Sequence, residues 1–123
     1  MSARLHELHG VRVLEAQADG GPVTGERDAV DLVGLGLEQG AEWVAVPVQR
    51  LGEDFFRLAN RIAGEVIQKF VNYRMKLAVV GDISAQVQDS KALRDFVYES
   101  NRGTHVWFVA DLADLEQRLA AAA

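Results

Sequence analysis

The sequence contains no cysteine, only two prolines and two methionines, and no long apolar run. The absence of cysteine excludes disulfide bonds, thiolate metal sites and a cysteine nucleophile. The longest apolar runs are a few residues long, whereas a membrane-spanning helix needs about 20. The first ten residues, MSARLHELHG, lack the apolar block of a signal peptide. We therefore expect a cytoplasmic protein that has no membrane partner.

Positively charged residues are also few: the sequence has 13 Lys and Arg against 18 Asp and Glu, which gives a net charge of −5. Nucleic-acid binding that is driven by electrostatics requires a cationic surface, so we expect no nucleic-acid partner. The composition, 49% hydrophobic and 25% charged, is typical of a folded globular protein. We expect a single domain over residues 1–123 with a frayed C-terminal alanine tail.

Three continuous apolar runs predict strands that are covered on both faces of a sheet. They occupy residues 43–48, 77–81 and 105–109. Two shorter runs, at residues 5–8 and 11–14, flank a His-Gly pair and predict a β-hairpin.

Helical patterns separate these strands. The clearest covers residues 55–74 (FFRLANRIAGEVIQKFVNYR), with Asp54 as its N-cap. Further helices are predicted from an N-cap at Ser90 or Asp89, after a polar loop over residues 84–89, and from an N-cap at Asp111. Helical crossovers between consecutive strands imply parallel pairing, with residues 77–81 in the middle of the three apolar strands. The sequence thus predicts an α/β fold with a mostly parallel or mixed central sheet of about four to five strands and flanking helices.

One more helix is predicted after an N-cap at Thr24. Val30, Val33 and Leu37 follow helical spacing and predict its buried side, and Gly40 is its expected stop.

Two phrases of the sequence, AGEVIQKFVNYRMKLAVVGD and SKALRDFVYESNRG, resemble a bacterial family catalogued only as a domain of unknown function, number 4180. The resemblance extends over about residues 11–111. This family implies no particular activity.

The layout of a hairpin followed by alternating helices and strands is similar, more loosely, to STAS domains (sulfate transporter and anti-sigma factor antagonist). This resemblance implies a STAS-like fold and a regulatory role through protein–protein interaction. In STAS domains a serine in the turn that opens a helix is phosphorylated, which switches a partner off. The matching place here, residues 51–56 (LGEDFF), has no hydroxyl group. Either the switch is lost, or the carboxylates supply a fixed negative charge at the helix start.

The same segment is our candidate interaction surface. If Phe56 faces the sheet, Phe55 lies about 100° away around the helix and is exposed beside Leu51. Packing of Phe55 under the preceding loop is an equal alternative. The candidate surface comprises Leu51, Glu53, Asp54, Phe55 and Arg57.

A polar patch is expected where two predicted helices end. Its members are Lys69, Asn72, Tyr73, Arg74, Glu99, Asn101 and Arg102. Tyrosine and arginine are enriched at binding hot spots, which favours an interface. The ordinary alternative, which we prefer, is that the cations compensate helix dipoles and the asparagines satisfy backbone groups.

A ligand edge is expected where the parallel strands end, since open α/β sheets bind ligands at the carboxyl ends of their strands. Asp82, Asp54 and Asp111 could meet there and hold a divalent cation, with Arg50 as an anion anchor. The alternative, which we prefer, is that two of these carboxylates cap helices and Asp82 stabilises a turn.

No arrangement of a nucleophile and a base is visible, and no glycine-rich phosphate loop is present. We expect no catalytic residue, no metal site and no cofactor. The sequence favours a non-catalytic regulatory module that binds another protein, and itself as a homodimer. The alternative is a small-ligand-binding protein or a metal-dependent enzyme that uses the carboxylates at the strand ends.

Overall fold

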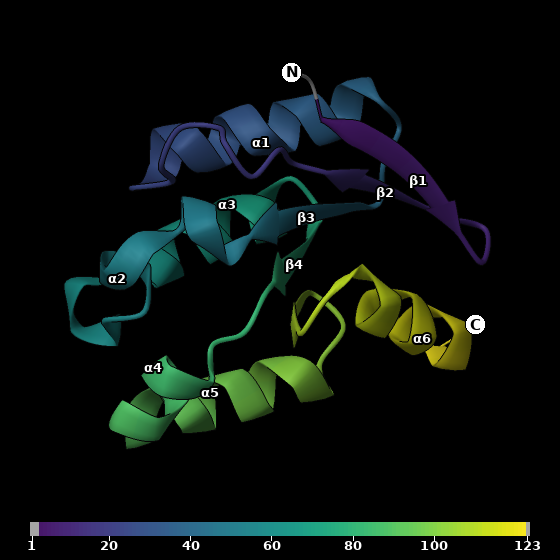
Figure 1. Ribbon diagram of the computed structural model, residues 1–123. Helices are drawn as coiled ribbons and strands as arrows, with labels where there is room; N and C mark the ends of the chain where they lie inside the picture. Colours follow the sequence, from purple (N-terminus) through teal and green to yellow (C-terminus); the bar gives the residue numbers. More distant parts are fainter. Residues whose placement is uncertain (1–2, 123) are drawn as a thin grey trace.

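Five strands form one sheet in the computed structural model, which describes residues 3–122 (Figure 1). In spatial order they are β1 (Arg4–Leu8), β2 (Val11–Glu15), β3 (Trp43–Pro47), β4 (Lys76–Val80) and β5 (Val106–Val109). β1 and β2 pair antiparallel, and every later pair is parallel. The predicted α/β class and the mostly parallel, mixed sheet are confirmed, and β4 lies between β3 and β5 as expected.

The hairpin turn consists of His9 and Gly10, both with a left-handed backbone, at φ 53° and 80°. Two such residues between paired strands give the two-residue turn whose twist matches that of a hairpin. Leu8 therefore stands opposite Val11, which sets the register of β1 on β2.

Helices cover both faces of the sheet (Figure 1). α1 (Glu26–Glu38), α3 (Ile62–Asn72) and α5 (Lys91–Arg102) connect successive parallel strands and pack on one face. They share that face because crossovers of one hand that advance in one direction stay on one side of a sheet. α6 (Leu112–Ala122) packs on the other face with Trp43, Trp107, Leu115 and Leu119, and it continues through the alanine tail as far as Ala122.

The continuous helix predicted for residues 55–74 is wrong. The chain instead forms η1 (Val48–Arg50), α2 (Gly52–Phe55) and η2 (Leu58–Asn60) before α3 begins. Arg57 is extended, and Arg61 has a left-handed backbone with φ 68°. Asn60 holds the break, because its Nδ2 donates to the Asp54 carbonyl at 2.9 Å and its Oδ1 accepts from the Ile62 amide at 3.1 Å. Such side-chain bonds to the backbone compete with helix hydrogen bonds, so an amphipathic pattern does not guarantee one helix.

α1 buries a different side from the predicted one. Its buried residues are Ala29, Leu32, Val33 and Gly36. Val30 and Leu37 are 38% and 54% exposed. A Cβ on Gly36 would lie 2.9 Å from both Met75 Cε and Val44 Cγ2, so the absent side chain is what lets α1 approach the sheet. Of the three predicted residues only Val33 is buried, because the helix turns Ala29, Leu32 and the small Gly36 toward the sheet.

The helix caps agree with the sequence in two cases out of four, since Asp54 lies inside α2 and does not cap a helix. The side chains of Ser90 and Asp111 each accept a hydrogen bond from a backbone amide three residues on, at 3.1 and 2.8 Å. The Thr24 cap is wrong, because its amide and its hydroxyl both donate to Asp28. A short helix, α4 (Ser84–Asp89), replaces the predicted polar loop.

None of the helices found in residues 3–122 combines the length and the hydropathy that crossing a bilayer would require.

Candidate functional site

The candidate interaction surface around α2 does not present an apolar face. Leu51 and Phe55 are buried, at 5% and 1% exposed, and Phe55 packs edge-on against Phe56 with ring centroids 5.2 Å apart. The expectation of an exposed Phe55 is therefore wrong. Both aromatic rings enter the core because α2 is only one turn long and the chain leaves it at once. Charged side chains remain outside, and the side chains of Arg57 and Glu53 approach to 3.8 Å.

The members of the expected polar patch have separate partners. Lys69 lies 3.9 Å from Glu26 of α1, and Asn72 accepts a hydrogen bond from a neighbouring glutamine on α3. Arg102 lies 3.7 Å from Glu99, and Asn101 bonds to β5 and α6. Tyr73 is half-exposed. Within residues 3–122, no hydrogen bond or ion pair joins the members on α3 to those on α5, and only Arg102 and Glu99 pair with each other.

The carboxylates of the expected ligand edge also serve separate purposes. Asp82 accepts hydrogen bonds from the Ser84 hydroxyl and amide at 2.6 and 2.9 Å. These two bonds, the hydroxyl first, lower the pKa of Asp82 below its ordinary value. Asp111 caps α6, whereas Asp54 is exposed on α2. In the described part of the chain no three histidine or carboxylate side chains cluster as metal ligands, so the three aspartates do not converge.

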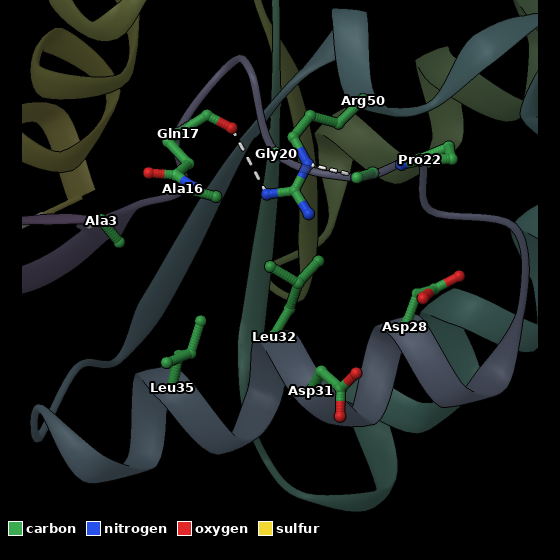
Figure 2. A pocket seen from close by; sticks show the side chains of 11 residues that line it. Ala3, Ala16, Gln17, Gly20, Pro22, Asp28, Asp31, Leu32, Leu35 and Arg50 are labelled. Atoms are coloured by element: carbon green, nitrogen blue, oxygen red, sulfur yellow. Dashed lines mark hydrogen bonds between the residues drawn. The ribbon is translucent and has the colours of Figure 1, made fainter. Parts of the chain in front are cut away.

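A cavity of about 490 Å³ lies at the carboxyl end of β2 and β3 (Figure 2). Its walls are the 16–22 loop, one side of α1 and Arg50 from η1, and Ala3 closes one end. Its size is within the usual range of small-molecule sites, roughly 300–1,000 Å³. The cavity therefore lies at the carboxyl edge of the sheet, where the sequence predicted ligand binding, and it includes Arg50 but none of the three predicted aspartates.

Arg50 is the side chain that organises this cavity. Its Nε donates to the Gly21 carbonyl at 2.7 Å and its Nη1 donates to the Gln17 carbonyl at 3.4 Å (Figure 2). A Cβ on Gly20 would lie 2.6 Å from Arg50 Cζ, so the guanidinium packs directly on the glycine backbone. The Arg50 carbonyl accepts from the Val23 amide at 2.7 Å, which fastens the same loop from the other side. The loop is thus a fixed wall, and no described carboxylate forms an ion pair with Arg50.

The two edges of the sheet differ in how their backbone groups are satisfied. On β5, the backbone groups of Trp107 and of the residues two positions before and after it point toward β4. The amide and the carbonyl of Phe108 therefore point away from the sheet. The Asn101 side chain accepts from that amide at 2.7 Å and donates to that carbonyl at 3.3 Å. This edge is closed at its centre.

The β1 edge is open. Leu8 and Val11 flank the two-residue turn and form a hydrogen-bonded pair. Because hydrogen-bonded positions alternate along an antiparallel strand, His6 and Arg4 also bond to β2. The backbone groups of Leu5 and Glu7 therefore point outward. No described residue bonds to these outward groups. β1 therefore offers a template for another strand.

Residues 8–119 match the sequence model of a protein family. The chain belongs to the family described as "Domain of unknown function (DUF4180)". No curated protein and no solved structure matches the chain significantly. The description of DUF4180 specifies no activity, so a function for the chain has to be argued from its own geometry.

Sequence reasoning offered Arg50 as a candidate anion anchor but missed the cavity and the sheet edges. The signals that were present are the Gly20-Gly21-Pro22 loop and an arginine three residues after a buried strand. The two residues whose carbonyls accept from Arg50, Gly21 and Gln17, lie 29 and 33 positions before it in the sequence. A local sequence pattern does not reveal contacts over such separations.

Proposed function

We propose that the protein is a non-catalytic regulatory module that acts through protein–protein interaction, and that a second copy of the chain pairs along β1. The observation that carries this proposal is the contrast between the two sheet edges. Asn101 closes β5, whereas the outward amides and carbonyls of Leu5 and Glu7 have no described partner. Proteins usually protect exposed edges against unwanted pairing, so one protected and one open edge favour a pairing function for the open one.

Apolar side chains beside the open edge support this interpretation. Leu5 stands opposite Leu14, which pairs with Val44 of the core under α1 and α3, so Leu5 lies on the α1 side of the sheet. Leu35 of α1 lines the same cavity as Ala3, the residue before β1, so it lies on the side of α1 toward the β1 edge. Leu5 and Leu35 are 40% and 43% exposed, and a second copy at this edge would cover both.

The sequence of β1 allows antiparallel pairing with itself. With a two-fold axis at Leu5, the two Leu5 residues stand opposite each other, Glu7 faces Ala3 of the second copy, and Arg4 faces His6 of the second copy. No two like-charged carboxylates or guanidinium groups meet in this register, and the opposed leucines form the favourable apolar pair. The product is a continuous sheet across the dimer.

Sedimentation velocity tests the proposal directly. The unaltered chain is expected to dimerise reversibly at or below roughly 100 µM, the range in which weak interfaces are occupied. Glu7→Pro removes one outward amide that makes no bond within the monomer, and proline is tolerated on edge strands, so the variant should fold but stay monomeric. Leu5→Lys should also be monomeric. Val30→Lys, on the opposite flank of α1, is the matched control and should still dimerise.

Circular dichroism confirms the folding of each variant. A monomeric unaltered chain would refute self-pairing, as would an unchanged dimer in Glu7→Pro.

A small-ligand role is the second candidate function, because Arg50 faces a cavity without a carboxylate partner. Catalysis that depends on a metal has less support, since Asp54, Asp82 and Asp111 do not converge.

A further inference from the structure

The cavity beside Arg50 presents hydrogen-bond donors that the chain does not use. A guanidinium has five N–H groups, and the Gly21 and Gln17 carbonyls accept one each, which leaves three. Figure 2 shows that the remaining terminal nitrogen points from Arg50 toward α1, into the space between the two walls. A planar carboxylate matches such a fork with two parallel hydrogen bonds.

The same cavity also presents an acceptor without a donor. Asp31 projects from α1 on the wall opposite Arg50 and has no hydrogen-bond or ion-pair partner in the described part of the chain, whereas Asp28 is occupied by Thr24 (Figure 2). An ammonium group is a charged donor and forms a strong hydrogen bond with such a carboxylate.

Apolar surface separates these two polar groups. Leu32, Leu35 and Ala16 line the cavity, and Leu35 is 43% exposed although it is a large apolar side chain. Burial of such surface favours a ligand with an aliphatic body, at about 25 cal/mol for each Å² removed from water.

We propose that this cavity binds a free aliphatic amino acid. The carboxylate bonds to Arg50, the ammonium group bonds to Asp31, and the aliphatic side chain packs on Leu32 and Leu35. A cation on one wall and a carboxylate on the other select a zwitterion over an anion or an amine of the same shape. This site is separate from the backbone edge of β1, and its occupation does not depend on dimerisation.

L-leucine is the probe, compared with two molecules that each lack one charge. 4-Methylpentanoate lacks the ammonium group, and 3-methylbutylamine lacks the carboxylate. Titration followed by amide NMR should show saturable shifts at Gly20 and Gly21 with leucine, and at least about tenfold weaker binding of the other two, since bonds to charged groups are the strong ones. Leucyl-leucine carries its two charges on different residues and should also bind at least about tenfold more weakly.

Two variants identify the contacts. Asp31→Asn, at an exposed position, should weaken leucine binding about tenfold and leave 4-methylpentanoate unchanged. Arg50→Gln should abolish the leucine shifts, whereas Arg57→Gln, an exposed arginine outside the cavity, should bind as the unaltered chain does. Because Arg50 also holds the loop, circular dichroism and the other amide signals verify that Arg50→Gln is folded.

Several results would overturn the proposal. They are the absence of leucine shifts at Gly20 and Gly21, equal binding of leucine and either single-charge molecule, equal binding of leucyl-leucine, and an Asp31→Asn variant with unaltered affinity for leucine. The failure of dimerisation would overturn only the function proposed above.

Discussion

The side-chain amide of Asn101 makes two hydrogen bonds with the backbone of Phe108, accepting from its amide at 2.7 Å and donating to its carbonyl at 3.3 Å. It occupies the position that one peptide group of a sixth strand would take. The Asn101 carbonyl accepts a hydrogen bond from Arg118, whose guanidinium lies 4.2 Å from the centre of the Trp107 ring. One residue thus ties α5 to the edge strand and to α6.

Asn101→Ala should lower the free energy of unfolding by about 1–3 kcal/mol, because it leaves the partly buried Phe108 amide and carbonyl without partners. The matched control is Asn72→Ala on α3, where the bond to Gln68 is exposed and should be worth less than about 0.5 kcal/mol. Urea unfolding measures both. Equal effects of the two substitutions would contradict the role assigned to Asn101.

Two glycines of α1 should respond to alanine with opposite signs. A Cβ on Gly36 meets Met75 and Val44 at 2.9 Å, and the stiff Val44 side chain cannot move away easily, so Gly36→Ala should cost about 1–2 kcal/mol. No atom lies within 4 Å of a Cβ on Gly34, so Gly34→Ala should stabilise by about 0.5–1 kcal/mol through helix propensity alone. Thermal unfolding of the pair gives the comparison. Two changes of the same sign would show that α1 does not approach the sheet as closely as described.

Phe55→Ala should destabilise the protein by about 3–5 kcal/mol, as expected when a fully buried aromatic side chain is deleted from a core. Tyr98 is 62% exposed, so Tyr98→Ala is the control and should change stability by less than about 0.5 kcal/mol. Chemical unfolding distinguishes the two. A tolerated Phe55→Ala would return Phe55 to the surface that the sequence predicted.

The pKa of Asp82 should depend on the Ser84 hydroxyl, which is the main cause of its lowering. Ser84→Ala should raise that pKa toward the ordinary aspartate value near 4, whereas Ser84→Thr keeps the hydroxyl and should keep the pKa low. A lowered pKa in the folded state adds stability above the unfolded pKa, and this contribution is lost as the pH falls through the folded pKa. The stability difference between the chain and Ser84→Ala should therefore shrink below about pH 4. Carboxyl NMR titration measures the pKa, and an unchanged value in Ser84→Ala would contradict the assignment.

β3, β4 and β5 could be predicted from the sequence because each contains an uninterrupted apolar run with helical segments on both sides, and the hairpin of β1 and β2 because two short runs flank a His-Gly pair. The caps at Ser90 and Asp111 could be predicted because a cap is a contact over three residues. The break before α3 could not, since Asn60 reads as an ordinary polar residue until its two backbone bonds are known.

The buried side of α1 and the cavity were beyond sequence reasoning for a related reason. Gly36 lies against Met75, which is 39 positions later in the sequence, and there is no room for a side chain. A search for apolar periodicity does not count glycine as an apolar residue, so it cannot find this buried position. The cavity combines the 16–22 loop, α1 and Arg50, which the chain brings together only after the sheet has formed. Arg50 was named as a candidate anion anchor, and its neighbours in the cavity were not.

α6 is the helix of residues 3–122 that packs on the second face of the sheet, and it lies over both tryptophans, whose rings are 4.5 Å apart. Because Trp43 and Trp107 are the two tryptophans of the sequence, the intrinsic fluorescence of the protein reports on that face alone. Detachment of α6 would admit water to both indoles and shift the emission to longer wavelength. Ligand binding beside Arg50, on the α1 side of the sheet, would leave the colour of the emission unchanged, so the chain carries its own optical probe for the docking of its last helix.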